Sequence, residues 1–173
     1  MYMSIVLLGY RGSGKTTIGR KLADRLWWKF VDTDDLIVQK AGKSIKDIFE
    51  QNGEPYFRDL ETAILEESLK LEDHVISLGG GAAQREENRQ ALLGCAHKRV
   101  YLRCDPQVLH RRIHTDPTTA ANRPNLTALG GGLEEIRHLL EQREPNYRAV
   151  ATAELDVTNL TPEEATVYIV RLL

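Results

Sequence analysis

Residues 9–16 of this 173-residue chain read Gly-Tyr-Arg-Gly-Ser-Gly-Lys-Thr, a spacing that is typical of a phosphate-binding loop. Glycines in such a loop leave a concave row of backbone N–H groups open to one anion. Lys15 could reach the β- and γ-phosphates of a nucleotide, and the Thr16 hydroxyl could ligate Mg²⁺. An apolar run at 5–8 precedes the loop and an amphipathic helical pattern follows it, as this motif requires. A glycine-rich turn that binds nothing does not account for all of these features.

Two carboxylates follow the next strand that the sequence predicts, at 28–31. Asp32 and Asp34 would therefore lie at the edge of the sheet where open α/β proteins bind their ligands. One carboxylate could hold a water on Mg²⁺, while the other accepts the proton of a hydroxyl group during phosphoryl transfer. The alternative is that they only cap the helix that follows.

Two arginines lie on predicted long helices. Arg58 has Glu54 four residues before it and Glu61 three residues after it. This spacing fits a solvated ion pair on a helix face, and equally a guanidinium that Glu61 orients toward a substrate carboxylate. Arg143 could bind the same kind of group or simply complement the dipole at the end of its helix. Spacing alone does not decide between these alternatives.

Two further segments could contribute to a site. Three glycines at 79–81 follow a predicted strand at 74–78, and could form a tight turn or bring backbone N–H groups close to a small ligand. Residues 115–132 lack apolar periodicity and are rich in Thr, Asp, Pro, Asn and Gly, so we expect a mobile lid there. Arg123 in this segment is either a solvated loop residue or a charge that reaches the phosphates when the lid closes.

The elements that must position these residues alternate between strand and helix patterns, which indicates βαβ units and a parallel sheet. We predict a three-layer α/β/α fold with a central, mostly parallel five-stranded sheet, whose strands lie near 5–8, 28–31, 74–78, 98–102 and 155–157. Helix starts are marked at Ser44 and Gly53, and a capping box marks the last helix at Thr161. Trp27 and Trp28 are expected to pack around the second strand.

Composition narrows the class of protein. The length fits one domain, residues 1–173. The formal net charge of −2 gives no general attraction to nucleic acid or an anionic membrane. No apolar run approaches the ~18 residues that span a bilayer, and no signal peptide pattern is present, so a cytoplasmic protein is expected. A monomer is also expected. Cys95 and Cys104 have no metal-ligand spacing and are expected to be reduced.

Taken together, these residues resemble the shikimate kinase family, P-loop kinases related in architecture to nucleoside monophosphate kinases. The resemblance runs from about Ser4 to the C-terminus. It rests on the phosphate loop with its continuation Thr17-Ile18-Gly19-Arg20, Asp32-x-Asp34, Gly53-Glu54-x-x-Phe57-Arg58, Gly79-Gly80-Gly81, Arg123-Pro124 and Arg143-x-x-x-Tyr147. The Gly-Glu-x-x-Phe-Arg element with the triple glycine is much more specific than the phosphate loop alone.

The resemblance implies a P-loop kinase fold with a mobile lid and ATP-dependent phosphorylation of the 3-hydroxyl of shikimate, a step toward chorismate and the aromatic amino acids. Asp34 would bind ring hydroxyls, either as the base or only as a positioning group. Arg58 and Arg143 would clamp the substrate carboxylate, with Gly80 and Gly81 donating backbone hydrogen bonds. The substrate-binding segment would be 32–72 and the lid 112–132.

The resemblance also implies a nucleotide site, with Mg²⁺ as the cofactor of ATP. The residues expected to bind the nucleotide are Gly12, Ser13, Gly14, Lys15, Thr16, Thr17, Arg112 and Arg123. Lys15, Asp34 and Arg123 would be catalytic. The metal would be held by Thr16 and, through water, by Asp32. Residues 159–162 would border the adenine together with Arg112.

The lid departs from the family pattern in two respects. It reads Arg123-Pro124-Asn125-Leu126 where the family usually has Arg-Pro-Leu-Leu, and the stretch before it, 118–122, is long. These departures leave lid closure and affinity open, but not the reaction class. The rival interpretations are another small-molecule kinase of the same architecture, such as a gluconate or nucleotide kinase, and an ATP-binding regulatory protein without turnover.

Overall fold

The computed structural model describes residues 4–116 and 130–173. Its centre is a parallel five-stranded sheet in the order β2-β3-β1-β4-β5. The strands are β1 (Ser4–Leu8), β2 (Lys29–Asp32), β3 (His74–Ser77), β4 (Lys98–Arg103) and β5 (Ala153–Asp156). The predicted α/β class and parallel sheet are therefore confirmed. Strand β5 starts two residues earlier than predicted, because its pairing with β4 begins at Ala153.

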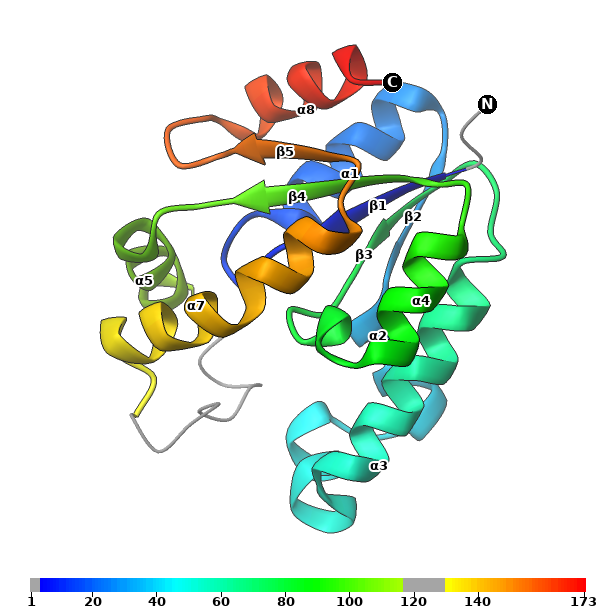
Figure 1. The fold of residues 1–173 in the computed structure, drawn as a ribbon, viewed down its shortest axis with the longest axis vertical. Coiled ribbons are helices and arrows are strands. Elements are labelled where there is room, and N and C mark those ends of the chain that lie inside the picture. The colour runs from blue at the N-terminus through cyan, green and yellow to red at the C-terminus, as the bar shows by residue number, and fades with distance from the viewer. Residues whose placement is uncertain (1–3, 117–129) are drawn as a thin grey trace.

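Helices cover both faces of this sheet (Figure 1). Helices α1 (Lys15–Leu26) and α8 (Pro162–Arg171) pack on one face, where they meet Ile5 and Leu7 of β1. Helices α3 (Ile45–Ser68), α4 (Glu86–Gly94) and α7 (Leu133–Val150) meet Val6 and Leu8 on the other face. Successive side chains of a strand point to opposite faces, so the continuous apolar run of β1 is buried on both sides.

Three further helical elements of the described ranges lie close to the carboxyl edge of the sheet. They are α2 (Thr33–Ala41), the 3₁₀ turn η1 (Ala82–Gln84) and α5 (Pro106–Thr115). Helix α3 joins the two helix starts that the sequence predicts. Ser44 caps its first turn, and Gly53 interrupts it with a non-helical φ of 81° and ψ of 168°. The chain therefore bends at Gly53, and Pro55 falls in the first turn after the bend.

The prediction for Trp27 was wrong. Helix α1 ends at Leu26, and Trp27 adopts a left-handed conformation with φ of 59° while its N–H bonds to helix carbonyls. This cap turns the Trp27 side chain into solvent, where 95% of it is exposed. Trp28 packs against the core as predicted. The apolar pattern of the sequence does not reveal where α1 ends, and this local ending leaves Trp27 exposed while Trp28 is packed.

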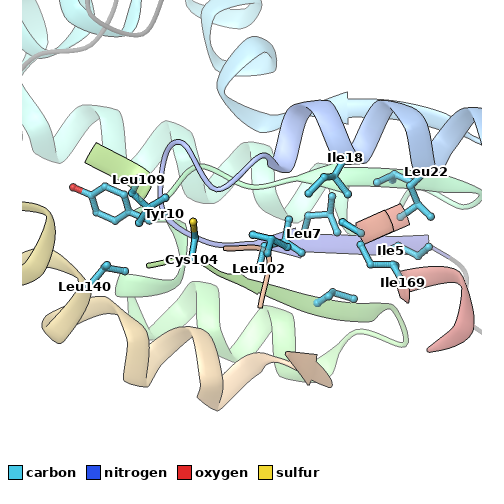
Figure 2. Packing of buried hydrophobic residues seen from close by; sticks show 14 of the residues in the cluster. Ile5, Leu7, Tyr10, Ile18, Leu22, Leu102, Cys104, Leu109, Leu140 and Ile169 are labelled. Atoms are coloured by element: carbon cyan, nitrogen blue, oxygen red, sulfur yellow. The ribbon is translucent and has the colours of Figure 1, made fainter. Parts of the chain in front are cut away.

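One hydrophobic cluster of the core extends along the sheet as far as the carboxyl ends of its strands (Figure 2). Tyr10, from the phosphate loop, lies at the end of this cluster near Leu109 of α5 and Leu140 of α7. Cys104 belongs to the same cluster, and both cysteines are free, as predicted. No helix in the described ranges 4–116 and 130–173 is long and apolar enough to cross a membrane.

Candidate active site

The phosphate loop joins the carboxyl end of β1 to the N-terminus of α1. Gly9, Gly12 and Gly14 take positive φ angles of 148°, 82° and 97°. Lys15 Nζ donates hydrogen bonds to the carbonyl oxygens of Gly9 and Tyr10, at 2.7 and 3.0 Å. The ammonium group therefore lies over its own loop, at the positive end of the α1 dipole. This arrangement concentrates positive potential where an anion would bind.

A cavity of about 910 Å³ opens beside the phosphate loop. We call it the larger cavity, and its walls include all six loop and helix residues predicted to bind the nucleotide, from Gly12 to Thr17. Arg112 of α5 also lines this cavity, together with Leu160 and Pro162. Its guanidinium donates to the carbonyl oxygens of Gly12 and Val157, both at 3.4 Å. Arg112 and part of the 159–162 turn are thus brought to the same cavity as the phosphate loop.

Thr16 and Asp32 meet at the edge of this cavity. The Thr16 hydroxyl donates to Asp32 Oδ2 at 3.0 Å, and Asp32 Oδ1 accepts from the backbone N–H of Asp34 at 3.0 Å. Asp32 therefore caps α2 and also contacts the phosphate-loop threonine. Hydroxyl and carboxylate oxygens suit Mg²⁺, which takes few protein ligands and completes its shell with phosphates and water. The donor set fits that ion.

A second, smaller pocket adjoins the larger cavity. We call it the smaller pocket. It is lined by Arg11, Asp34, Ile45, Phe49, Phe57, Arg58, Glu61, Gly79, Gly80, Gly81 and Arg143. Asp34 and Arg11 also line the larger cavity, so they mark the junction of the two spaces. A molecule in the smaller pocket would thus meet a phosphate group from the larger cavity beside Asp34.

Arg58 and Glu61 form the charged wall of the smaller pocket. Arg58 Nη1 donates to Glu61 Oε2 at 2.8 Å, and its Nη2 contacts Glu54 Oε1 at 3.1 Å. The Glu61 side chain is only 2% exposed and that of Arg58 18%. This is not the solvated helix-face pair that the spacing also allowed. The buried carboxylate fixes the guanidinium, as a fork for a second carboxylate would require.

Burial also affects the pKa values of Glu61 and Arg58. Removal from water raises the pKa of Glu61, and the nearby Asp34 adds to the rise while Arg58 opposes it. Burial acts to lower the pKa of Arg58, but Glu61 and Glu54 outweigh it and the pKa is raised. Arg58 therefore stays charged, and Glu61 holds a proton more tightly than an exposed glutamate does.

Arg143 reaches the same pocket from α7. It is buried, and its guanidinium lies 5.6 Å from the centre of the Tyr10 ring, within the range of a cation–π contact. One helical turn later, the Tyr147 hydroxyl donates to the carbonyl oxygen of Gly80. Burial raises the pKa of Tyr147 to about 12, so the hydroxyl remains a donor. The helix thus holds both an arginine and the peptide of Gly80 at the pocket.

The triple glycine is explained by close approach rather than by a turn alone. A Cβ on Gly81 would lie 2.5 Å from Arg58 Nη1, and a Cβ on Gly79 would lie 2.7 Å from Asp34 Oδ1. Side chains at these positions would displace two of the charged groups of the smaller pocket. The N–H of Gly79 is bonded to the Thr33 hydroxyl at 3.0 Å, which anchors the segment to α2.

Sequence reasoning missed a second buried ion pair. Arg11 Nη2 lies 3.5 Å from Glu135 Oε2, and the two side chains are 9% and 0% exposed. Arg11 occupies a variable position of the loop motif, and Glu135 resembles any acidic residue in the first turn of a helix. Neither local pattern could identify the contact. Arg123, which the sequence assigns to a lid over the phosphates, lies outside the described residues.

A parallel sheet of this order, with a phosphate loop after β1 and a charged pocket at the same edge, defines a small-molecule kinase of the P-loop class. The sequence model described as shikimate kinase matches residues 11–173. The chain therefore belongs to the shikimate kinase family.

Known relatives agree with this assignment. The chain is 43% identical to the shikimate kinase of Streptococcus gordonii, over 94% of this chain and 95% of the relative. It is 40% identical to that of Caldanaerobacter subterraneus subsp. tengcongensis, over 97% and 94%. A shikimate kinase from Acinetobacter baumannii, solved in complex with shikimate, is similar with a TM-score of 0.91 and 34% identity, covering 99% of this chain and 93% of that one.

Proposed function

We propose that this protein transfers the γ-phosphoryl group of ATP to the 3-hydroxyl of shikimate. Family membership supports the reaction class and the substrate pair. The observation that carries the proposal is the junction of the larger cavity and the smaller pocket at Asp34. A nucleotide in the larger cavity would direct its terminal phosphate toward a hydroxyl group in the smaller pocket.

In this proposal, two arginines from different helices hold the carboxylate of shikimate. Arg58, already oriented by Glu61, forks onto the carboxylate of shikimate. Arg143 binds the same carboxylate from α7, backed by the Tyr10 ring. Asp34 binds the hydroxyl group that reacts and receives its proton as the phosphoryl group is transferred. Gly80 and Gly81 bring backbone groups to the ring.

The nucleotide is held by the phosphate loop. Its backbone N–H groups and Lys15 bind the phosphates, and Arg112 lies by the base. Thr16 and, through water, Asp32 would hold Mg²⁺, which neutralises charge on the β- and γ-phosphates when bound. Arg123 is proposed as the lid arginine, over residues 112–132, that excludes water from the reacting phosphate.

The test is an assay of ADP production with purified protein, ATP and Mg²⁺, and with shikimate, gluconate or nucleoside monophosphates as acceptors. We expect ADP to form with shikimate and to match the shikimate 3-phosphate produced. Absence of turnover with shikimate, or a better rate with one of the other acceptors, would overturn the proposal. ATP binding without turnover on any acceptor would favour the regulatory alternative.

We further propose that the protein acts as a cytoplasmic monomer. Light scattering of the purified protein is expected to give a mass near the 19.6 kDa of one chain. A mass of twice this value that persists on dilution would contradict the proposal.

A further inference from the structure

The Arg11–Glu135 ion pair joins the phosphate loop to the helix that carries Arg143. Arg11 is a loop residue, and Glu135 lies in the first turn of α7. Both side chains are almost completely buried, and Glu135 lines neither the larger cavity nor the smaller pocket within the described residues. A fully buried carboxylate is costly unless it is paired, so this contact constrains both elements.

The same face of α7 makes a second contact with the loop. Glu135, Leu139 and Arg143 are spaced four residues apart, which places them along one side of the helix. Tyr10 packs in a cluster with Leu139 and receives the Arg143 guanidinium over its ring. Two consecutive loop residues, Tyr10 and Arg11, therefore hold two points of α7 that are about 12 Å apart along its axis.

Within the part of the chain that the structure describes, Arg143 lacks the carboxylate partners that hold Arg58. No carboxylate of the described residues forms an ion pair with it, whereas Arg58 has Glu61 and Glu54. Its guanidinium lies close to Gly80, since a Cβ there would be 3.5 Å from Arg143 Nη1. A small rotation or shift of α7 would move this guanidinium relative to the substrate carboxylate, because the helix is rigid over two turns.

We propose that Glu135, through Arg11, is a positioning residue for acid binding: the ion pair fixes α7 against the phosphate loop so that Arg143 meets the substrate carboxylate. This inference rests on the proposed function. It assigns no contact between Glu135 and either substrate. The predicted consequence of breaking the pair is a change in affinity for shikimate, with smaller effects on nucleotide affinity and on the chemical step.

The experiment compares Glu135→Gln with Glu134→Gln. Glu134 lies in the same helical turn, but its side chain is 77% exposed and pairs with Arg137 on the surface. We expect Glu135→Gln to raise the KM for shikimate about five- to twenty-fold, as for coupled neighbouring residues. The KM for ATP and kcat should stay within about two-fold of the wild-type values. Glu134→Gln should leave all three constants unchanged.

A double-mutant cycle identifies the partner. If Glu135 acts through Arg11, Glu135→Gln should have little further effect on the shikimate KM in an Arg11→Met background. Effects that multiply, or equal changes in the KM for shikimate and ATP, would overturn the proposal. A purely structural ion pair would lower the melting temperature and the active fraction while leaving KM unchanged.

Two controls distinguish failure of this inference from failure of the proposed function and from failure of the variant to fold. Wild-type turnover with shikimate is measured first, and its absence refutes the proposed function, whereas normal turnover with an unaffected Glu135→Gln variant refutes only this inference. If Glu135→Gln does not fold, Glu135→Asp keeps the charge and moves the carboxylate by one methylene. That variant should raise the shikimate KM in the same direction by a smaller factor, and an unchanged KM would overturn the proposal.

Discussion

At the scale of single residues, the smaller pocket contains two arginines whose guanidinium groups are held in place by neighbouring side chains. Arg58 is fixed by the buried Glu61 and by Glu54, while Arg143 is backed by an aromatic ring. Fixing a guanidinium before the ligand arrives reduces the side-chain entropy that binding must overcome. In the proposed function, the two arginines form a prearranged receptor for the substrate carboxylate, and each can be tested separately.

Replacing Arg58 with alanine should weaken acid binding and largely spare the nucleotide. Truncating one partner of a buried, hydrogen-bonded charge pair costs roughly 2 kcal/mol or more, so the KM for shikimate should rise at least about 30-fold. Steady-state kinetics with each substrate varied in turn measures this. Arg85→Ala is the matched control, since Arg85 also pairs with α3, through Asp59, but lies outside the smaller pocket. Equal losses in both variants would contradict the assigned role.

Gly81→Ala tests the close approach at the triple glycine. The new Cβ would fall 2.5 Å from Arg58 Nη1, so the guanidinium must move. We expect a rise in the shikimate KM of about ten-fold, which is 1.4 kcal/mol of lost interaction. Gly94→Ala, where nothing lies within 4 Å of the added carbon, is the control and should leave kinetics unchanged. An unaltered KM in Gly81→Ala would show that this contact does not matter for binding.

At the scale of elements, backbone strain at the C-terminal end of α1 lowers the stability of the fold. Trp27 takes the left-handed conformation that suits glycine, and its side chain has almost no contacts to offset the strain. Trp27→Gly should therefore raise the free energy of unfolding by about 1 kcal/mol. Urea denaturation followed by circular dichroism measures the change.

Trp27→Ala separates the two contributions, because it removes the indole ring but keeps the Cβ that causes the strain. This variant should not show the gain in stability. If both variants were equally stabilised, the exposed ring rather than the backbone conformation would be responsible, and the strain argument would be wrong.

The bend in α3 is a second feature at this scale. The helix starts at Ser44 and turns at Gly53, so Phe49 lies before the bend and Phe57 after it. Their rings meet with centroids 4.7 Å apart, and both line the smaller pocket. The bend therefore folds one helix around the pocket and brings Arg58 to the same wall.

At the scale of the whole molecule, the buried charges link stability to pH. Burial raises the folded-state pKa of Glu61 above its usual 4.5, so the folded protein holds this proton over a range where the unfolded chain has lost it. Its stabilising contribution is complete below that usual value and is lost as pH rises through the folded-state pKa. The stability of the wild type relative to Glu61→Gln should therefore fall as pH increases above 4.5.

Urea unfolding of both proteins across this pH range tests the sign. Glu66→Gln is the control, because Glu66 is an exposed residue of the same helix. Its difference from the wild type should not follow the same trend. A wild type that gains stability relative to Glu61→Gln as pH rises would show that the ion pair with Arg58 outweighs burial, and that the pKa of Glu61 is lowered.

At the same scale, helices α5 and α7 both lie beside the phosphate loop. Helices α5 and α7 pack together (Figure 1). Tyr10 lies in the core near Leu109 and Leu140 (Figure 2). The phosphate loop and the smaller pocket therefore share a structural boundary. The proposed role of Glu135 requires that a change in the loop reaches Arg143 through α7, without any contact to shikimate.

The sequence by itself determined the phosphate loop, the parallel α/β architecture and the placement of Asp32 and Asp34 at the sheet edge. These features depend on short spacing and on apolar periodicity, which are local properties of the chain. The resemblance also predicted the substrate arginines, and the structure brings Arg58 and Arg143 to one pocket.

Only the tertiary structure decided which charges are buried and paired. Glu134 and Glu135 are neighbours of the same type in one helical turn, yet one is exposed and the other lies against Arg11. Likewise, the spacing of Arg58 and Glu61 fits a solvated helix face, and Gly79 and Gly81 fit a simple turn. Their surroundings come from other elements, and burial, pKa and close approach depend on those long-range neighbours rather than on local pattern.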